Sequence, residues 1–175
     1  MRLAETKLPI ALASLVVIAL TFSAPLASQD NLPGTPGENR VRVGMSLGST
    51  GFVGIIAEYR FGDWSGELTV GTISFRDLSV AVAGKRYFAG GSIRPALGAG
   101  FWSLTAWSEE GSGSVFIFRV PVALDWEVSG GHGIGAEVGM NRALAVDRID
   151  PEDDTPVQSR LVGFPGIYYR YGWDP

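Results

Sequence analysis

The feature that most constrains this chain is a period-two alternation of apolar residues, which recurs eight times. It is clearest at 115–128, where Phe116 and every second residue after it are apolar. Because successive side chains of a strand point to opposite faces, these residues share one face of an extended ribbon. The opposite face is mixed and contains Arg119, Asp125 and Glu127. The two faces therefore meet different environments.

A barrel that is soluble in water places its continuous apolar face inside, whereas here that face is expected outside, and charge and glycine inside. This arrangement predicts an all-β, eight-stranded antiparallel up-and-down transmembrane β-barrel. Most of the segments have the roughly 9–11 residues that a tilted strand needs to cross a bilayer. The expected strands are 40–47, 52–61, 64–73, 78–88, 92–105, 115–128, 133–144 and 159–173.

Four positions interrupt the alternation. In the fifth expected strand Leu97 and Phe101 share one face, but Trp102 and Leu104 share the other, which predicts a bulge near Gly100. Proline cannot donate to a β-ladder, so a bulge or local break is also expected at each proline inside a strand. These prolines are Pro95, Pro121 and Pro165.

The connections between the expected strands differ in length. The second, fourth and sixth are short, at 62–63, 89–91 and 129–132. The first, third, fifth and seventh are expected to be longer, at 48–51, 74–77, 106–113 and 145–157. Outer-membrane barrels have short periplasmic turns and longer extracellular loops. The pattern therefore predicts that both chain ends lie on the periplasmic side.

The N-terminal segment has the order of features found in a secretory signal. Arg2 and Lys7 precede an apolar run at 8–22, and small residues follow it. The run is shorter than the 18 or more residues typical of a membrane-spanning helix, although an uncleaved anchor is the alternative. We expect a signal peptide at 1–28, a proline- and glycine-rich linker at 29–38, and an outer-membrane β-barrel domain at 39–175.

Two segments and the overall pattern resemble a known family. The segments are Arg94–Gly100, which reads RPALGAG, and Ile167–Trp173, which reads IYYRYGW. Together with the glycine-broken amphipathic strands over 39–173, they are similar to the small eight-stranded outer-membrane barrels of Gram-negative bacteria, the OmpA/OmpX-like and opacity-porin-like superfamily. The resemblance implies residence in the cell outer membrane, and recognition of the C-terminal aromatic segment by the barrel-assembly machinery. Asp174 and Pro175 extend past the aromatic residue at which this family usually ends.

The charged residues of the strands share the inward face. An eight-stranded lumen is just wide enough for side chains, and an unpaired buried charge costs several kcal/mol, so six basic and five acidic groups predict a paired network that plugs the barrel. A gated polar path is the alternative. The expected interior charge network is Arg42, Glu58, Arg60, Glu67, Lys85, Arg94, Arg119, Asp125, Glu127, Glu137 and Arg170.

Aromatic residues gather on the outward face near the expected periplasmic end. Indole and phenol groups favour the boundary between apolar and aqueous surroundings, so an aromatic girdle is expected. A stacking platform for nucleic acid is disfavoured because the chain has a formal net charge of −4 and no basic groove. The girdle residues are Tyr59, Phe61, Trp64, Trp126, Tyr169, Tyr171 and Trp173.

No pattern in the chain favours catalysis. Any Ser–His–acid triad would require His132, the single histidine, which we expect to be a solvated turn residue at the periplasmic end. The acidic run at 147–154 lacks the spacing of a calcium loop, so a solvated loop is expected. We therefore predict no catalytic, cofactor-binding or metal-binding residues, no cofactor and no nucleic-acid partner.

The expected function is that of a non-enzymatic outer-membrane barrel that serves envelope integrity or surface interaction, with outer-membrane lipid as its surroundings. Two alternatives remain at the level of the sequence. One is an exported soluble barrel that binds an apolar ligand, as lipocalins do, which would require the apolar face inside. The other is a lipid-modifying outer-membrane enzyme.

Overall fold

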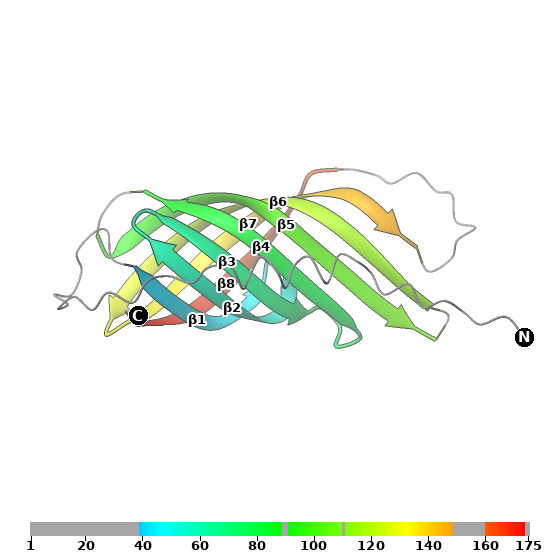
Figure 1. Ribbon diagram of the computed structural model, residues 1–175, viewed down its shortest axis with the longest axis horizontal. Coiled ribbons are helices and arrows are strands. Elements are labelled where there is room, and N and C mark those ends of the chain that lie inside the picture. Colours follow the sequence, from blue (N-terminus) through cyan, green and yellow to red (C-terminus); the bar gives the residue numbers. More distant parts are fainter. Residues whose placement is uncertain (1–38, 89–90, 110, 149–159, 174–175) are drawn as a thin grey trace, which may run out of the picture. The chain divides into compact units, whose positions relative to one another are not determined.

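The computed structural model describes residues 39–88, 91–109, 111–148 and 160–173, and these form one closed barrel of eight antiparallel strands (Figure 1). The predicted all-β, eight-stranded antiparallel barrel is confirmed. The expected signal peptide and linker lie outside the described residues. The strands are β1 (Arg40–Gly48), β2 (Gly51–Phe61), β3 (Trp64–Thr72), β4 (Asp77–Tyr87), β5 (Ile93–Ser108), β6 (Gly111–Ser129), β7 (His132–Asp147) and β8 (Val162–Trp173).

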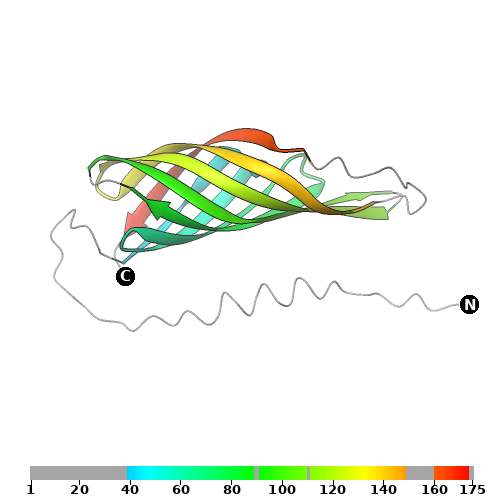
Figure 2. The ribbon, with the colours of Figure 1, turned by 90° about the horizontal axis from the view of Figure 1, so that it is seen from above.

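Each strand pairs with the next in sequence, and β1 pairs with β8 to close the barrel, so strands tilted against the barrel axis form a complete wall (Figure 2). The pair Val41–Trp173 places the start of β1 beside the end of β8. We call this the terminal end of the barrel, and the opposite end, which carries the β1–β2 and β3–β4 turns, the loop end. No helix long and apolar enough to cross a membrane occurs in the described ranges.

Strand β5 contains no bulge at Gly100, which corrects the prediction. Its pairing with β4 keeps one register from Asp77–Ala106 to Tyr87–Ala96. Trp102 consequently points into the barrel, where it is buried. The prediction assumed that a large apolar side chain must point outward, but the lumen holds an apolar cluster of Ala81, Trp102 and Ile117 at the loop end.

The three strand prolines also leave the register unchanged, contrary to the predicted bulges or breaks. Pro95 pairs with Leu124, Pro121 with Gly139, and Pro165 with Val138, and the pairs on either side keep the same register. The carbonyl groups of Pro95 and Pro165 accept hydrogen bonds from the backbone nitrogens of Phe88 (2.8 Å) and Ser49 (2.9 Å). Each proline therefore removes a donor from the ladder without displacing the strand. Register shifts occur instead at Leu47/Gly48, Phe116/Ile117 and Glu127/Ser129.

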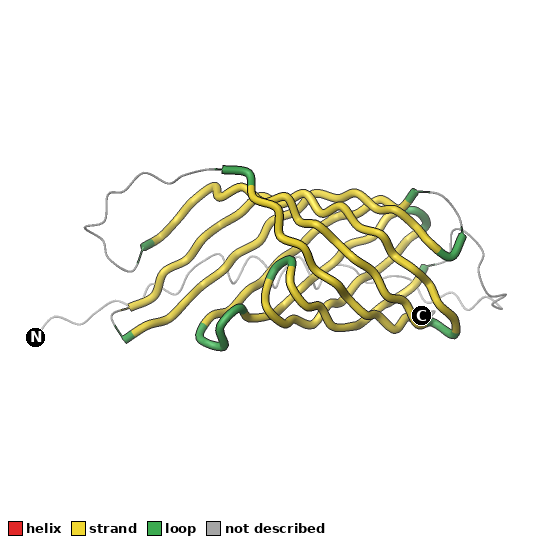
Figure 3. Tube along the Cα trace, turned by 180° about the vertical axis from the view of Figure 1, so that it is seen from behind, coloured by secondary structure: helices red, strands yellow, loops and turns green. Residues whose placement is uncertain are grey.

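The connections between strands differ less in length than the sequence predicted. The β1–β2 connection is only 49–50. The expected loop at 106–113 is reduced to a connection of two residues, 109–110, because β5 and β6 stay paired up to Ser108–Gly111. The long β5–β6 hairpin and β7 project past the other strands at the loop end (Figure 3). The β7–β8 connection spans 148–161, of which 149–159 lie outside the described residues.

The barrel is polar inside and apolar outside. Fifteen buried residues of the described ranges are polar or charged, whereas nine are hydrophobic. Thirty large hydrophobic residues are exposed, and most of them belong to the outward positions of the strands. This distribution is the reverse of that in a protein folded around a hydrophobic core, so the lumen is where the structure concentrates its chemistry.

Candidate functional site

The lumen holds a continuous chain of ion pairs in which acidic and basic side chains alternate. Within the described residues, eight buried groups form seven pairs, and seven of the eight strands contribute; β5 does not. Four positive groups balance four negative ones, so the core of the network is neutral. In order, the chain is Asp125, Arg42, Glu58, Arg170, Glu67, Lys85, Glu137 and Arg119.

One end of this chain is organised by Arg42 on β1. Its Nε donates to Glu58 Oε2 at 2.7 Å, and its Nη1 pairs with Asp125 of β6 on the far wall. Its Nη2 donates to the hydroxyl of Tyr87 at 2.6 Å, and that hydroxyl in turn donates to Glu58 Oε1 at 2.7 Å. Glu58 is 2% exposed, so this charge depends on protein donors alone. The guanidinium of Arg42 thus links β1 to β2, β4 and β6 across the lumen.

The centre of the chain is Arg170 on β8, which is 1% exposed. Its Nη1 lies 3.0 Å from Glu58 Oε2, and its Nη2 pairs with Glu67. The guanidinium also stacks on the ring of Tyr168 at 3.9 Å. That ring fits because its register partner is Gly135, where a Cβ atom would overlap it. The inward glycine on β7 therefore makes room for the tyrosine that supports Arg170.

The other end of the chain runs through Lys85 on β4. Its Nζ lies 2.8 Å from Glu67 Oε2 and 2.6 Å from Glu137 Oε2, so it joins the β3 and β7 walls. Glu137 also pairs with Arg119, and it accepts a hydrogen bond from the hydroxyl of Ser49 at 2.7 Å. Each of these carboxylates therefore has more than one donor, as buried charges require.

A second, partly exposed layer lies at the terminal end. Arg40 pairs with Glu127, and Nη2 of Arg94 lies 3.8 Å from Glu127 Oε2. Arg94 and Glu127, expected inside the network, are thus half-buried at its rim rather than part of the central chain. Arg60 is buried, but it stacks on the ring of Tyr87 at 4.4 Å and donates to the carbonyl of Gly62 at 3.2 Å.

Toward the loop end the lumen contains a cluster of apolar side chains. Trp102 is packed with Ala81 and Ile117, and Leu104 and Val115 lie against this group. The indole Nε1 of Trp102 donates to the hydroxyl of Ser79 at 2.8 Å, and its ring meets Phe164 of β8 edge-on at 6.1 Å. The ion-pair chain is consequently covered by an apolar layer on this side.

A cavity of about 10 Å³ lies beside Ser49, Glu67 and Arg119. A cavity must offer about 10–15 Å³ to hold a water molecule, so this one has room for a single water at most. The chain of buried ion pairs across this part of the lumen favours the paired plug over a gated polar path.

The expected girdle residues lie on the outer surface. Phe61, Trp64, Trp126, Tyr169, Tyr171 and Trp173 are exposed, and Tyr59 is half-exposed. Neighbouring rings contact one another: Tyr171 and Trp173 have centroids 6.2 Å apart. All of these residues belong to strand segments at the terminal end.

His132 is the first residue of β7 and joins this aromatic surface. Its Nδ1 lies 2.6 Å from the hydroxyl of Tyr169, and its ring centroid is 5.0 Å from that of Tyr171. Within the described residues no hydrogen bond joins it to a serine or a carboxylate. Most of the acidic run at 147–154 lies outside the described residues.

Several residues of the network were not identified from the sequence. Tyr87 and Tyr168 supply a hydroxyl and a ring at its centre, and Arg40 and Ser49 complete its edges. The period-two alternation could have identified three of them, because each shares the inward face of its strand with a charged residue of the network. The pairs are Tyr87 with Lys85, Tyr168 with Arg170, and Arg40 with Arg42. Ser49 lies in a turn, where the alternation gives no indication.

Comparison of the chain with protein-family models, curated proteins and solved structures finds no match.

Proposed function

We propose that this chain is a non-enzymatic outer-membrane β-barrel of the small eight-stranded, OmpA/OmpX-like and opacity-porin-like class, exported through its N-terminal segment. The observation that carries the proposal is the inverted distribution of polarity. An antiparallel barrel with a buried ion-pair chain and thirty exposed large hydrophobic residues suits hydrocarbon surroundings. Exposed apolar patches of this extent are rare on soluble monomers.

Closure of the barrel supports the same proposal. Every strand has two paired neighbours, so the wall has no open edge that would leave backbone groups unbonded in hydrocarbon. The aromatic residues at the terminal end would then lie at the periplasmic boundary of the membrane. The plugged lumen favours a role in envelope integrity or surface interaction over transport.

The experiment is fractionation of the expressing cells combined with electrophoresis of boiled and unboiled samples. We expect the protein in the outer-membrane fraction, with the unboiled, folded form migrating differently from the boiled form. Recovery in the soluble fraction with identical migration of both samples would refute the proposal and favour the soluble, ligand-binding barrel.

A further inference from the structure

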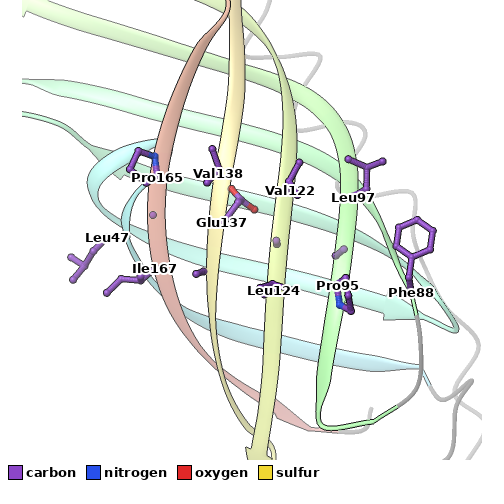
Figure 4. Close-up of a pocket in the computed structure, with 14 residues that line it drawn as sticks. Leu47, Phe88, Pro95, Leu97, Val122, Leu124, Glu137, Val138, Pro165 and Ile167 are labelled. Carbon is purple, nitrogen blue, oxygen red and sulfur yellow. The ribbon is translucent and has the colours of Figure 1, made fainter.

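The outer surface of the barrel carries an apolar groove that crosses the strands. Outward side chains form two rows over β5 to β8, and one of the rows continues to Phe88 at one end and to Leu47 of β1 at the other. The groove of about 870 Å³ lies between the rows (Figure 4). Its floor is backbone, because the residues between the rows point their side chains into the lumen, as Glu137 does. The rows are Leu97, Val122, Val138 and Pro165 on one side, and Phe88, Pro95, Leu124, Ala136, Ile167 and Leu47 on the other.

One end of the groove is marked by an arginine that points outward. Arg86 is the register partner of Leu97, which begins the first row. Its guanidinium lies 5.5 Å from the ring centroids of both Trp64 and Phe88. It is exposed, and it forms no ion pair in the described part of the chain. A cation is thus held by two aromatic rings on a surface that is otherwise apolar.

The groove is inclined to the barrel axis. Its Phe88 end lies at the terminal end of β4, whereas Leu47 lies at the loop end of β1. Between them are five strand spacings, about 24 Å at the usual separation of paired strands. An extended apolar molecule that lies in the groove would therefore begin at the charged rim of the barrel and run toward the middle of the apolar outer band.

We propose that Arg86 and this groove form a binding site for a glycerophospholipid. The phosphate group binds the guanidinium of Arg86, and one acyl chain lies in the groove. The site rests on the proposed membrane location, with the terminal end at the periplasmic boundary. Arginine suits this role because its planar donors match phosphate oxygens, and its apolar stem packs on the outer surface beneath the charged head.

A second acyl chain has space on the other side of Arg86. There the outward positions of β3 and β4 are the paired glycines Gly66 and Gly84. A Cβ atom added at Gly66 would meet nothing within 4 Å, and one at Gly84 would meet only a backbone oxygen at 4.0 Å. The wall beside Arg86 is therefore bare, and a lipid with two chains can straddle the arginine.

Native mass spectrometry of the folded barrel in detergent tests the site. Phosphatidylglycerol is compared with diacylglycerol of the same chains, which lacks the phosphate. We expect one phosphatidylglycerol to bind about fivefold more tightly than diacylglycerol, as one arginine near a lipid phosphate provides. Excess inorganic phosphate should not displace it, because the groove supplies the remaining affinity.

Two variants separate the parts of the site. Arg86→Ala should remove the preference for phosphatidylglycerol over diacylglycerol, and Ala136→Phe, which fills the groove, should weaken both lipids. Arg142→Ala and Ala57→Phe change outward residues away from the groove and should leave both affinities unchanged. Heat-modifiability establishes that each variant is folded before it is measured.

The outcomes distinguish this inference from the proposed function. A membrane-inserted barrel in which Arg86→Ala keeps its preference for phosphatidylglycerol, or Ala136→Phe binds like the parent, overturns the lipid site alone. Displacement by inorganic phosphate would reduce the site to an anion contact and would also overturn it. A barrel recovered from the soluble fraction would instead refute the membrane location on which the site rests.

Discussion

Replacing Arg170 with methionine removes the central cation of the lumen and keeps much of the side-chain volume. Arg170 is 1% exposed and pairs with Glu58 and Glu67. Breaking a buried ion pair costs about 3–5 kcal/mol, because the remaining charge is left uncompensated. Each carboxylate keeps one other cation, namely Arg42 for Glu58 and Lys85 for Glu67, so we expect a loss near the lower limit, about 3 kcal/mol.

The assay is urea unfolding of the barrel reconstituted in lipid vesicles, followed by tryptophan fluorescence. The double variant Arg170→Met/Glu67→Gln restores a neutral lumen and should recover much of the lost stability. Arg76→Met, in the exposed β3–β4 turn, provides the control for loss of an arginine as such. Ordinary surface substitutions change the free energy of unfolding by up to about 0.5 kcal/mol. If the free energy of unfolding of Arg170→Met differs from that of the parent by no more than this, the ion-pair chain does not stabilise the barrel as argued.

Three further predictions follow from the two faces of the wall. Val122→Arg places a charge in the outward apolar band and should destabilise the barrel in vesicles by roughly 2–4 kcal/mol. Glu109→Arg, in the β5–β6 connection, should change the stability by less than about 0.5 kcal/mol. Equal tolerance of the two substitutions would contradict the bilayer assignment. Gly135→Ala should cost about 1–3 kcal/mol because its methyl group overlaps the ring of Tyr168, and an unchanged urea midpoint would show that the ring can move aside. The unmutated barrel should show no stable conductance in planar bilayers, and a persistent open channel would refute the plugged lumen.

The alternation of the sequence was sufficient to predict the strand count and the antiparallel order, and it assigned the charged side chains of the strands to the lumen. This information is local, because a strand places every second side chain on one face regardless of its partners. The charged set at Arg42, Glu58, Lys85 and Arg170 could therefore be assigned to the interior from phase alone. The same rule would have included Tyr87, but its aromatic character did not suggest a place among charges.

The partners within the lumen could not be predicted in the same way. Arg42 reaches Asp125 on β6, and Lys85 reaches Glu137 on β7, although neither pair lies on adjacent strands. These contacts depend on closure of the wall, which brings opposite sides within side-chain reach. The apolar cluster around Trp102 was not predicted for a related reason, since outward and inward apolar residues look alike in sequence.

The sequence by itself thus determined the kind of wall this chain builds, because period-two alternation is a property of each strand separately. Only the tertiary structure decided how the lumen is filled. Register and closure set which carboxylate meets which cation, and they keep Pro95, Pro121 and Pro165 in the ladder without a bulge. They also bring Arg86 to the end of a groove whose rows come from five other strands. Such relations depend on distances between strands that are far apart in sequence, and no local pattern records them.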